Sequence, residues 1–313
     1  MTAAAEGAGD GTYMGFVGVT TGQSSIRRVF PAWARTLGLP TGTLVGHDVV
    51  PGSDPEVYRA LVAQIRDDPQ HRGALVTTHK VAVYEACRDM FDDLDDLATT
   101  FGEVSSIYKR DGRLCGAAKD PVTVRLALEE FLPADHFATT GAEVLCLGSG
   151  GSGMALSHQL GVRADRPARV TCTARRQEQL DHVRELHERA GLPGDLFRYV
   201  VTAQPEQADE LLAGLPAGSL VVNATGMGKD VPGSPLTDAA RWPADGLAWE
   251  FNYRGSLEFL HQAQAQADAR GLTVEDGWRY FVHGWSQVIG DVFAVPMPHA
   301  TVAELADVAA AVR

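Results

Sequence analysis

Basic residues are scarce in this chain of 313 residues, and they form no cluster. Lysine and arginine together number 27, against 40 aspartates and glutamates, so the formal net charge is −13. Because nucleic acids and anionic membrane surfaces are bound through basic patches, this balance argues against both as main partners. The sequence also lacks an uncharged apolar run long enough to span a membrane.

The sequence also lacks paired cysteines, metal-ligand spacings and a secretory signal. The 4 cysteines form no C-x-x-C pair, which excludes a disulfide framework and suits a reducing compartment. The histidines lack zinc-site spacing, so no metal is expected. The acid-rich run over residues 92–96 matches no calcium loop, and we expect a solvated helix face there. The N-terminus lacks the basic and apolar regions of a secretory signal, so a cytoplasmic location is expected.

Strand-like and helix-like segments alternate along the chain. Glycine and proline are not periodic and 45% of the residues are apolar, as in a globular protein. The expected strands cover residues 13–19, 43–47, 74–77, 105–109, 113–116, 144–147, 170–173, 197–201, 219–223 and 246–252. The expected helices cover residues 25–37, 54–67, 83–90, 121–130, 151–160, 257–270, 278–290 and 301–313. This alternation predicts an α/β fold with parallel sheets.

The order of these segments predicts two domains. Residues 1–130 would form an α/β domain that binds the substrate, completed by C-terminal helices in residues 275–313. Residues 135–274 would form a Rossmann-type domain with a doubly wound parallel sheet. Ligands of such sheets gather at the carboxyl ends of the strands, so we expect the candidate residues there.

A glycine-rich loop follows the expected strand over residues 144–147. Such a loop, placed between a strand and a helix, is typical of a dinucleotide site. The first glycine makes the turn, the next lets the backbone approach a pyrophosphate, and the last lets the helix pack closely. The helix N-terminus favours phosphate groups. The predicted cofactor contacts in this loop are Gly148, Ser149, Gly150, Gly151, Ser152 and Gly153.

The residues after the next strand indicate which dinucleotide is bound. Arg175 and Arg176 follow the strand over residues 170–173, and no acidic residue stands at its end. An acidic residue there would bind the ribose 2′-hydroxyl of NAD, whereas arginine accommodates the 2′-phosphate of NADP. The sequence therefore favours NADP, with NAD as the alternative.

Lys80 and Asp120 are the candidates for proton transfer. Each follows an expected strand, and a lysine whose pKa is adjusted by burial can act as an acid or a base. Neither residue needs to be catalytic to occupy its position in the sequence. Lys80 could be a solvated loop residue, and Asp120 could be only the N-cap of the helix that starts at Pro121.

The order of several short motifs resembles the shikimate/quinate dehydrogenase family over nearly the full length. The helix over residues 24–39 aligns with the family's "S-x-S-P" helix, and residues 73–80 resemble its "G-x-x-V-T-x-P-H-K" loop. Residues 102–106 and 116–120 fall on "G-A-V-N-T" and "G-x-N-T-D". The glycine loop matches "G-x-G-G-x-x-x-A", residues 222–228 resemble "V-N-A-T-P-x-G-M", and residues 276–277 match its "D-G".

This resemblance implies an oxidoreductase that acts on a cyclic polyol. Lys80 would be the acid/base group, and Asp120 would be its partner. The implied substrate contacts are Ser24, Thr77, Ser105, Tyr253 and His283. Further cofactor contacts, from the loop that resembles "V-N-A-T", would be Asn223, Ala224, Thr225 and Met227. The protein would be a monomer or a homodimer.

The sequence departs from the family where the substrate is expected to bind. Ile26 replaces the second serine of the first helix, one of two that hold the substrate carboxylate. Ser105 and Ala118 replace two asparagines, and Gly284 stands at the position of a glutamine. A site that has lost its carboxylate contacts should no longer prefer a carboxylate. These departures favour a cyclitol-like ring.

Two alternatives to a cyclitol dehydrogenase remain open. The first is an authentic shikimate dehydrogenase in which Arg27 or Arg28 replaces the lost serine and binds the carboxylate. Against this role, both arginines could simply be exposed on the helix. The second is a catalytically silent dinucleotide-binding sensor. The presence of both Lys80 and Asp120 argues against the sensor, because binding alone does not need this pair.

Overall fold

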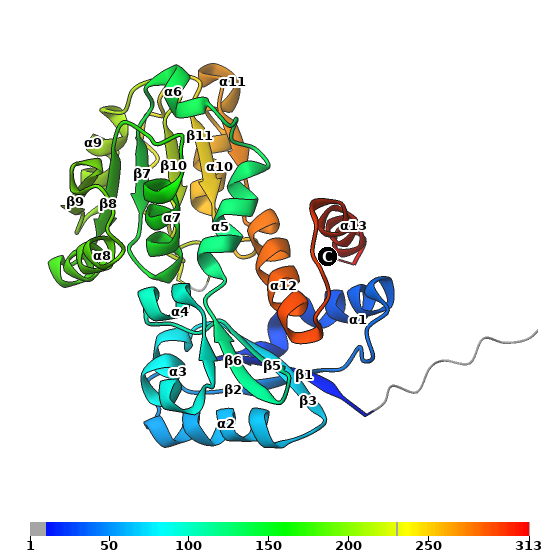
Figure 1. Cartoon of the computed structure of the whole chain (residues 1–313). Coiled ribbons are helices and arrows are strands. Elements are labelled where there is room, and N and C mark those ends of the chain that lie inside the picture. The colour runs from blue at the N-terminus through cyan, green and yellow to red at the C-terminus, as the bar shows by residue number, and fades with distance from the viewer. Residues whose placement is uncertain (1–10, 230, 313) are drawn as a thin grey trace, which may run out of the picture. The chain divides into compact units, whose positions relative to one another are not determined.

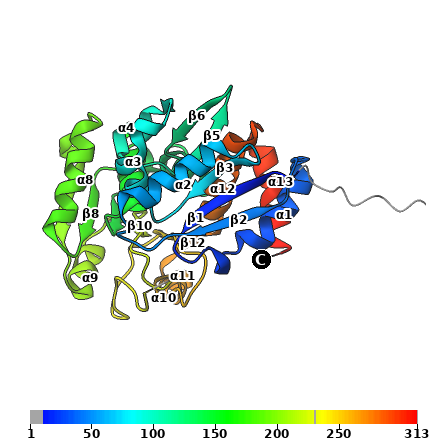
Figure 2. The same ribbon diagram turned by 90° about the horizontal axis from the view of Figure 1, so that it is seen from below.

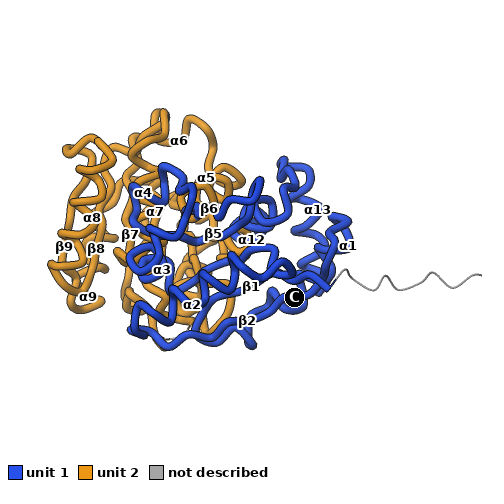
Figure 3. Tube along the Cα trace, turned by 60° about the horizontal axis from the view of Figure 1, so that its bottom comes forward, with its two compact units in different colours: residues 1–119, 282–313 blue, residues 120–281 orange. Residues whose placement is uncertain are grey.

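The computed structural model describes residues 11–229 and 231–312. The chain forms two compact units, which are coloured separately in Figure 3. The first unit comprises the chain up to Lys119 together with the segment from Val282 onwards, and the second runs from Asp120 to Phe281. The N-terminal residues in which no secretory signal was found, and the last residue of the expected C-terminal helix, lie outside the described residues.

The sheet of the first unit has six strands among the described residues, in the order β2-β1-β3-β5-β6-β4 (Figure 1). Their bounds are Tyr13–Gly18 (β1), Leu44–Asp48 (β2), His71–Val76 (β3), Asp93–Leu94 (β4), Ser106–Arg110 (β5) and Arg113–Ala117 (β6). β1 lies between β2 and β3 and is parallel to both, as Figure 2 shows.

One strand of this sheet runs against the expected direction. β5 is antiparallel to both β3 and β6, so the prediction of a wholly parallel sheet is wrong for the first unit. The reversal between β5 and β6 is made by Asp111 and Gly112, whose φ values are 52° and 77°. Positive φ at both central residues is the geometry of a two-residue hairpin turn, and Asp-Gly is a preferred sequence for it.

Helices cover both faces of this sheet, with α2 on the face opposite α1 and α13 (Figure 1). The C-terminal helices complete the unit through contacts with its first strands and helices. The indole of Trp33 donates to the carbonyl oxygen of Leu305 over 2.7 Å, and the rings of Phe16 and Trp285 lie 4.9 Å apart. The helices are α1 (Ile26–Leu37), α2 (Pro55–Asp67), α3 (Lys80–Cys87), α4 (Asp96–Phe101), α12 (Trp278–Phe293) and α13 (His299–Ala310), with short 3-10 turns at Thr21–Gln23 and Arg88–Met90.

The sheet of the second unit is parallel throughout its six described strands, in the order β12-β11-β10-β7-β8-β9. Numbered from β7, this is the doubly wound order, and its switch point lies between β7 and β10. The strands are β7 (Val144–Leu147), β8 (Val170–Ala174), β9 (Phe197–Val201), β10 (Leu220–Asn223), β11 (Leu247–Glu250) and β12 (Thr273–Glu275). The helices are α5 (Asp120–Glu129), α6 (His136–Thr140), α7 (Gly151–Val162), α8 (Gln177–Arg189), α9 (Pro205–Ala213), α10 (Glu258–Gln264) and α11 (Ala267–Arg270), with a 3-10 turn at Gly194–Leu196.

The boundaries of the units differ from the division read in the sequence. The sequence placed residues 120–130 in the first domain, whereas in the structure α5 packs against α7 and belongs to the second unit. α12 begins in the second unit and continues into the first, so its first turn belongs to the second unit and its remaining turns belong to the first.

The described residues include no helix long and apolar enough to cross a membrane. All four cysteines are free thiols, and all are buried. Among the described residues, no group of three histidine, cysteine or acidic side chains could hold a metal ion.

Acid should weaken the stabilisation that one buried histidine contributes to each unit. Burial lowers the pKa of His71 and of His187 to about 4. Between that value and the ordinary value near 6.5, the unfolded chain binds protons that the folded chain does not. The contribution of each histidine to the free energy of unfolding should therefore fall as the pH drops from about 6.5 to about 4, by up to about 3 kcal/mol. In the second unit Glu250 opposes this loss, because burial raises its pKa to about 7 and the folded chain takes up its proton first. Denaturant unfolding measured across this pH range checks the prediction.

A matched pair of variants on α8 isolates one of these contributions. His187 is buried and contacts the hydroxyl groups of Ser157 and Tyr199 at 2.8 Å each, whereas His182 is exposed on the same helix. His187→Gln should remove the acid-dependent loss that this histidine contributes to the second unit, and His182→Gln should leave the pH dependence of unfolding unchanged. Equal slopes for the two variants would contradict this account.

Candidate active site

The loop between β7 and α7 holds the glycines predicted to bind a dinucleotide. Gly148 has a φ of +103°, and a Cβ there would stand 2.8 Å from the backbone of Ala224. A Cβ on Gly153 would overlap the carbonyl oxygen of Gly148. Gly150, the N-cap of α7, differs because its φ of −81° is ordinary and a Cβ would meet nothing within 4 Å. The fold itself therefore requires glycine at two of these positions but not at Gly150.

The end of β8 borders the same loop. The hydroxyl of Ser149 donates to the carbonyl oxygen of Thr173 over 2.8 Å, so this side chain braces the loop. Gly151 begins α7, with Ser152 beside it, and the N–H groups of this first turn carry the positive end of the helix dipole. Arg175 and Arg176 follow β8 directly, and both side chains are exposed.

A second loop, at the end of β10, packs against the glycine loop. Asn223 at the end of β10 pairs with Leu147 at the end of β7, which brings Ala224 and Thr225 against Gly148. The side-chain oxygen of Asn223 accepts hydrogen bonds from the backbone N–H and the hydroxyl of Thr225, over 3.1 and 2.6 Å. Asn223 is fully buried and therefore shapes this loop from below.

A buried carboxyl group, Glu250 at the end of β11, holds the second loop in place. One of its oxygens accepts from the amide of Asn223 over 2.7 Å, and the other accepts from the backbone and the amide of Asn252, each over 2.7 Å. The same two amides also donate to the carbonyl oxygen of Met227, over 3.3 and 3.0 Å. Burial raises the pKa of Glu250 to about 7, with Glu258 adding to the increase. Glu250 is not among the residues predicted from the sequence.

Removing the acceptor capacity of Glu250 should disturb the second loop. In Glu250→Gln, the side chain keeps one acceptor oxygen and gains an NH2 group, which would face an N–H donor of either Asn223 or Asn252. Asn223 cannot turn its own amide to relieve this conflict without losing its bonds to Thr225. If this loop contacts the cofactor, the variant should raise the KM for the dinucleotide about tenfold, which corresponds to one lost hydrogen bond. Steady-state kinetics with varied cofactor checks this, with the exposed Glu210→Gln on α9 as the control. An unchanged KM in both variants would contradict the prediction.

In the first unit, Thr77, Lys80 and Ser105 come together where β3 ends and β5 begins. The hydroxyl of Thr77 donates to the carbonyl oxygen of Val17 over 3.1 Å. Lys80 is the first residue of α3, and its backbone N–H bonds to the carbonyl oxygen of Thr77 over 3.3 Å. The carbonyl oxygen of Lys80 in turn accepts from Val104, which precedes Ser105. The loop that resembles the family's lysine loop is thus fixed to β1 and to the segment before β5.

His79, beside Lys80, has a structural position. Its ring is 3% exposed and lies between the hydroxyl of Tyr58, at 3.2 Å, and the carbonyl oxygen of Val49, at 2.9 Å. These contacts tie the start of α3 to α2 and to the segment after β2. His79 therefore anchors the backbone from which Lys80 extends.

Ser24 lies in the turn after β1, at the same edge of the sheet, and is half-buried. Ile26, which follows it at the family's second serine position, is fully buried in the core. The guanidinium of Arg27 donates to the carbonyl oxygen of Thr21 over 3.3 Å, and Arg28 is exposed. Of the family's two helix-one serines, only Ser24 therefore presents a hydroxyl here.

The remaining candidate residues are distributed over both units. Asp120 is the first residue of α5 and is 9% exposed, with Pro121 in the second position. Tyr253 follows β11, and its ring centre lies 4.6 Å from that of Phe281. His283 is buried on α12, in the part of that helix that belongs to the first unit.

Curated relatives of this chain are shikimate dehydrogenases. The NADP⁺-dependent shikimate dehydrogenase of Salinibacter ruber is 32% identical over 223 residues, which cover 68% of this chain and 70% of the relative. Its counterpart from Methylobacterium radiotolerans is 29% identical over 253 residues, covering 80% of each chain. No family model matches the sequence.

Solved structures have the same fold. A shikimate dehydrogenase in complex with NADP⁺ has a TM-score of 0.72 at 17% identity and covers 95% of this chain and 94% of its own. The quinate dehydrogenase of Corynebacterium glutamicum in complex with NAD has a TM-score of 0.72 at 19% identity, covering 96% and 99%. The shikimate 5-dehydrogenase of Thermus thermophilus in complex with shikimate has a TM-score of 0.69 at 23% identity, covering 96% and 99%.

The curated relatives, together with the two-unit fold and its glycine-rich loop, place the chain among the NAD(P)-dependent oxidoreductases that act on CH–OH groups. Within this class, the chain belongs to the shikimate/quinate dehydrogenase family. The resemblance read from the sequence is thereby confirmed.

Proposed function

We propose that this protein is an NADP-dependent dehydrogenase that reversibly oxidises one secondary alcohol of a polyhydroxylated six-membered ring. The observation that carries the proposal is the glycine loop, packed at the switch point of the second sheet, in a chain of this family. Relatives that bear the name shikimate dehydrogenase support a shikimate-like ring as the substrate class.

The residues present fit a dinucleotide. The backbone at Gly150 is exposed and open, as the approach of a pyrophosphate requires. Gly151, Ser152 and the first turn of α7 would face the phosphates, with Ala224, Thr225 and Met227 contributing from the second loop. Arg175 and Arg176 would hold a 2′-phosphate, which favours NADP over NAD. When bound, the nicotinamide would supply or accept the hydride.

Lys80 would move the proton that accompanies the hydride. In the reductive direction its ammonium group donates a proton to the oxygen of the ring ketone, and in the oxidative direction the amine accepts the hydroxyl proton. Asp120 would accept a hydrogen bond from the same or the adjacent hydroxyl and so orient the ring. Thr77, Ser24, Tyr253 and His283 would contact the rest of the substrate.

Shikimate is the first candidate substrate, because curated relatives carry its name. Ser24 could bind its carboxylate, with Arg27 or Arg28 as a further contact from the same turn. A carboxylate-free cyclitol is the second candidate, and the position of Ile26 supports it. That side chain is fully buried, so it offers nothing to a carboxylate and cannot turn outwards without opening the core.

The experiment is a measurement of cofactor reduction with NADP⁺ and NAD⁺ against shikimate, quinate and a panel of cyclitols. We expect turnover with NADP⁺ and at least one ring alcohol. Turnover of shikimate would support the first candidate, and turnover of cyclitols alone would support the second. Binding of NADP⁺ without turnover of any ring alcohol would overturn the proposal in favour of a dinucleotide sensor.

A further inference from the structure

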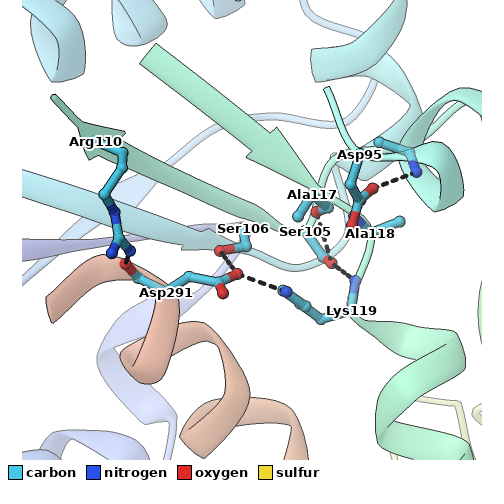
Figure 4. Close-up of polar contacts among 9 residues, drawn as sticks. Asp95, Ser105, Ser106, Arg110, Ala117, Ala118, Lys119 and Asp291 are labelled. Carbon is cyan, nitrogen blue, oxygen red and sulfur yellow. Dashed lines mark hydrogen bonds and ion pairs between the residues drawn. The ribbon is translucent and has the colours of Figure 1, made fainter. Parts of the chain in front are cut away.

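The three residues from the end of β6 to the start of α5 are held by side chains from elsewhere in the first unit. Figure 4 shows the segment Ala117–Lys119, which ends immediately before Asp120. The hydroxyl of Ser105 donates to the carbonyl oxygen of Ala117 over 3.4 Å and accepts from the backbone N–H of Lys119 over 2.7 Å. One carboxylate oxygen of Asp95 accepts from the backbone N–H of Ala118 over 3.2 Å.

An ion pair fixes the side chain of Lys119. Its ammonium nitrogen lies 2.9 Å from Oδ2 of Asp291 on α12, and the two side chains are 20% and 22% exposed. The same oxygen accepts from the hydroxyl of Ser106, which is fully buried, over 3.0 Å. The guanidinium of Arg110 donates to the backbone carbonyl of Asp291 over 2.9 Å. Asp291 is therefore bound on three sides to β5 and to this segment.

The position of these bonds in the sheet explains why side chains are needed. Ala117 is the last residue of β6, and its pairing with Ser106 is the last of the β5–β6 ladder. Beyond it the backbone has left the sheet, so the N–H groups of Ala118 and Lys119 turn to side chains of Asp95 and Ser105. Asp95 belongs to the acid-rich run over residues 92–96, whose assignment from the sequence was a solvated helix face. That assignment is wrong here, because Asp93 and Leu94 form β4 and Asp95 caps α4.

We propose that Lys119 and Asp291, with Ser105 and Asp95, are positioning residues that fix the direction in which Asp120 meets the substrate. The inference rests on the proposed role of Asp120, and it gives Ser105 a different role from the substrate contact implied by the family resemblance. Lys119 stands at the threonine position of the family's "G-x-N-T-D" pattern. Because leaving either charge of a largely buried pair unmatched is costly, the pair with Asp291 fixes the direction of the Lys119 side chain.

The test is a double-mutant cycle between Lys119→Met and Asp120→Asn. Because a small misplacement of a reacting group is costly, Lys119→Met alone should lower kcat about tenfold, with little change in KM. In the Asp120→Asn background the same change should lower kcat by less than about twofold, because the residue acts through Asp120. Lys119→Arg should restore most of the activity. Lys109→Met is the control, since that half-buried lysine on β5 bonds to the carbonyl oxygen of Asp68 instead.

Hydrogen exchange provides a readout that needs no substrate. Lys119→Met should speed amide exchange at Ala118, Lys119 and Asp120, while Lys109→Met should not. The inference would be overturned if the kcat of the double variant fell by the product of the two single losses. It would also be overturned if amide exchange over residues 118–120 were unchanged in Lys119→Met. If Asp120→Asn is impaired and Lys119→Met is not, only the positioning inference fails. If Asp120→Asn keeps its full kcat, the proposed role of Asp120 fails and the inference with it.

Discussion

Lys80→Met should lower kcat by about 10²- to 10⁴-fold, the usual contribution of a positioned acid or base. The backbone of Lys80 begins α3 and bonds to Thr77 and Val104 through main-chain atoms that the variant retains. His79, which anchors the start of this helix, is untouched. The fold should therefore survive, and the KM for the cofactor should stay close to its original value. Steady-state kinetics together with thermal unfolding separates the two effects.

Two controls make the result specific to the amine of Lys80. Lys109→Met removes another half-buried lysine of the same unit and should leave kcat unchanged. In Lys80→Ala, a small primary amine added to the buffer should recover part of the turnover, because it can occupy the space of the missing group. Retention of kcat within about threefold in Lys80→Met would show that another group transfers the proton.

Gly150→Val should raise the KM for NADP on the order of 100-fold, a loss of about 3 kcal/mol, without lowering the melting temperature. A Cβ at Gly150 meets nothing within 4 Å, and the backbone has an ordinary φ, so the folded chain has room for the side chain. The bulk would instead stand where the backbone is expected to approach a pyrophosphate. Loss of cofactor affinity with intact stability is therefore the expected signature.

The second unit offers a matched control for this substitution. Gly194, in the turn before β9, is also exposed, and a Cβ there would likewise meet nothing within 4 Å. Gly194→Val should leave both the melting temperature and the KM unchanged. If Gly150→Val binds NADP as tightly as the control, the dinucleotide does not approach this loop.

Five of the six described strands of the second unit, β7 to β11, could be predicted from the sequence. These strands are short apolar runs, and the loop of residues 148–153 has a clear physical reason for each required glycine. The first unit was predicted less well, because the alternation of strands and helices predicts parallel pairing, whereas β5 is antiparallel to β3 and β6. The signal was present at Asp111 and Gly112, which favour a tight hairpin turn. α8 and α9 were not predicted, and the helix expected over residues 257–270 is two shorter helices, α10 and α11.

The residues of the candidate site fall into two groups, those that could be predicted from the sequence and those that could not. Residues that belong to local motifs, such as Lys80 and Gly148, could be found because their neighbours in sequence are also their neighbours in space. Residues that act across the fold could not. Asp291 reaches Ser106 across 185 positions of sequence, and Glu250 reaches Asn223 across 27. Such partners become visible only when the sheets are assembled.

The most direct test of the central claim is the fate of a ring hydrogen during turnover. The protein would be incubated with NADP⁺ and ring-perdeuterated shikimate, or the perdeuterated form of whichever cyclitol reacts in the panel, and the reduced cofactor would be analysed by mass spectrometry. We predict that the reduced cofactor carries deuterium and that Lys80→Met forms it far more slowly. Reduced cofactor without deuterium, or none with any ring alcohol, would contradict the account.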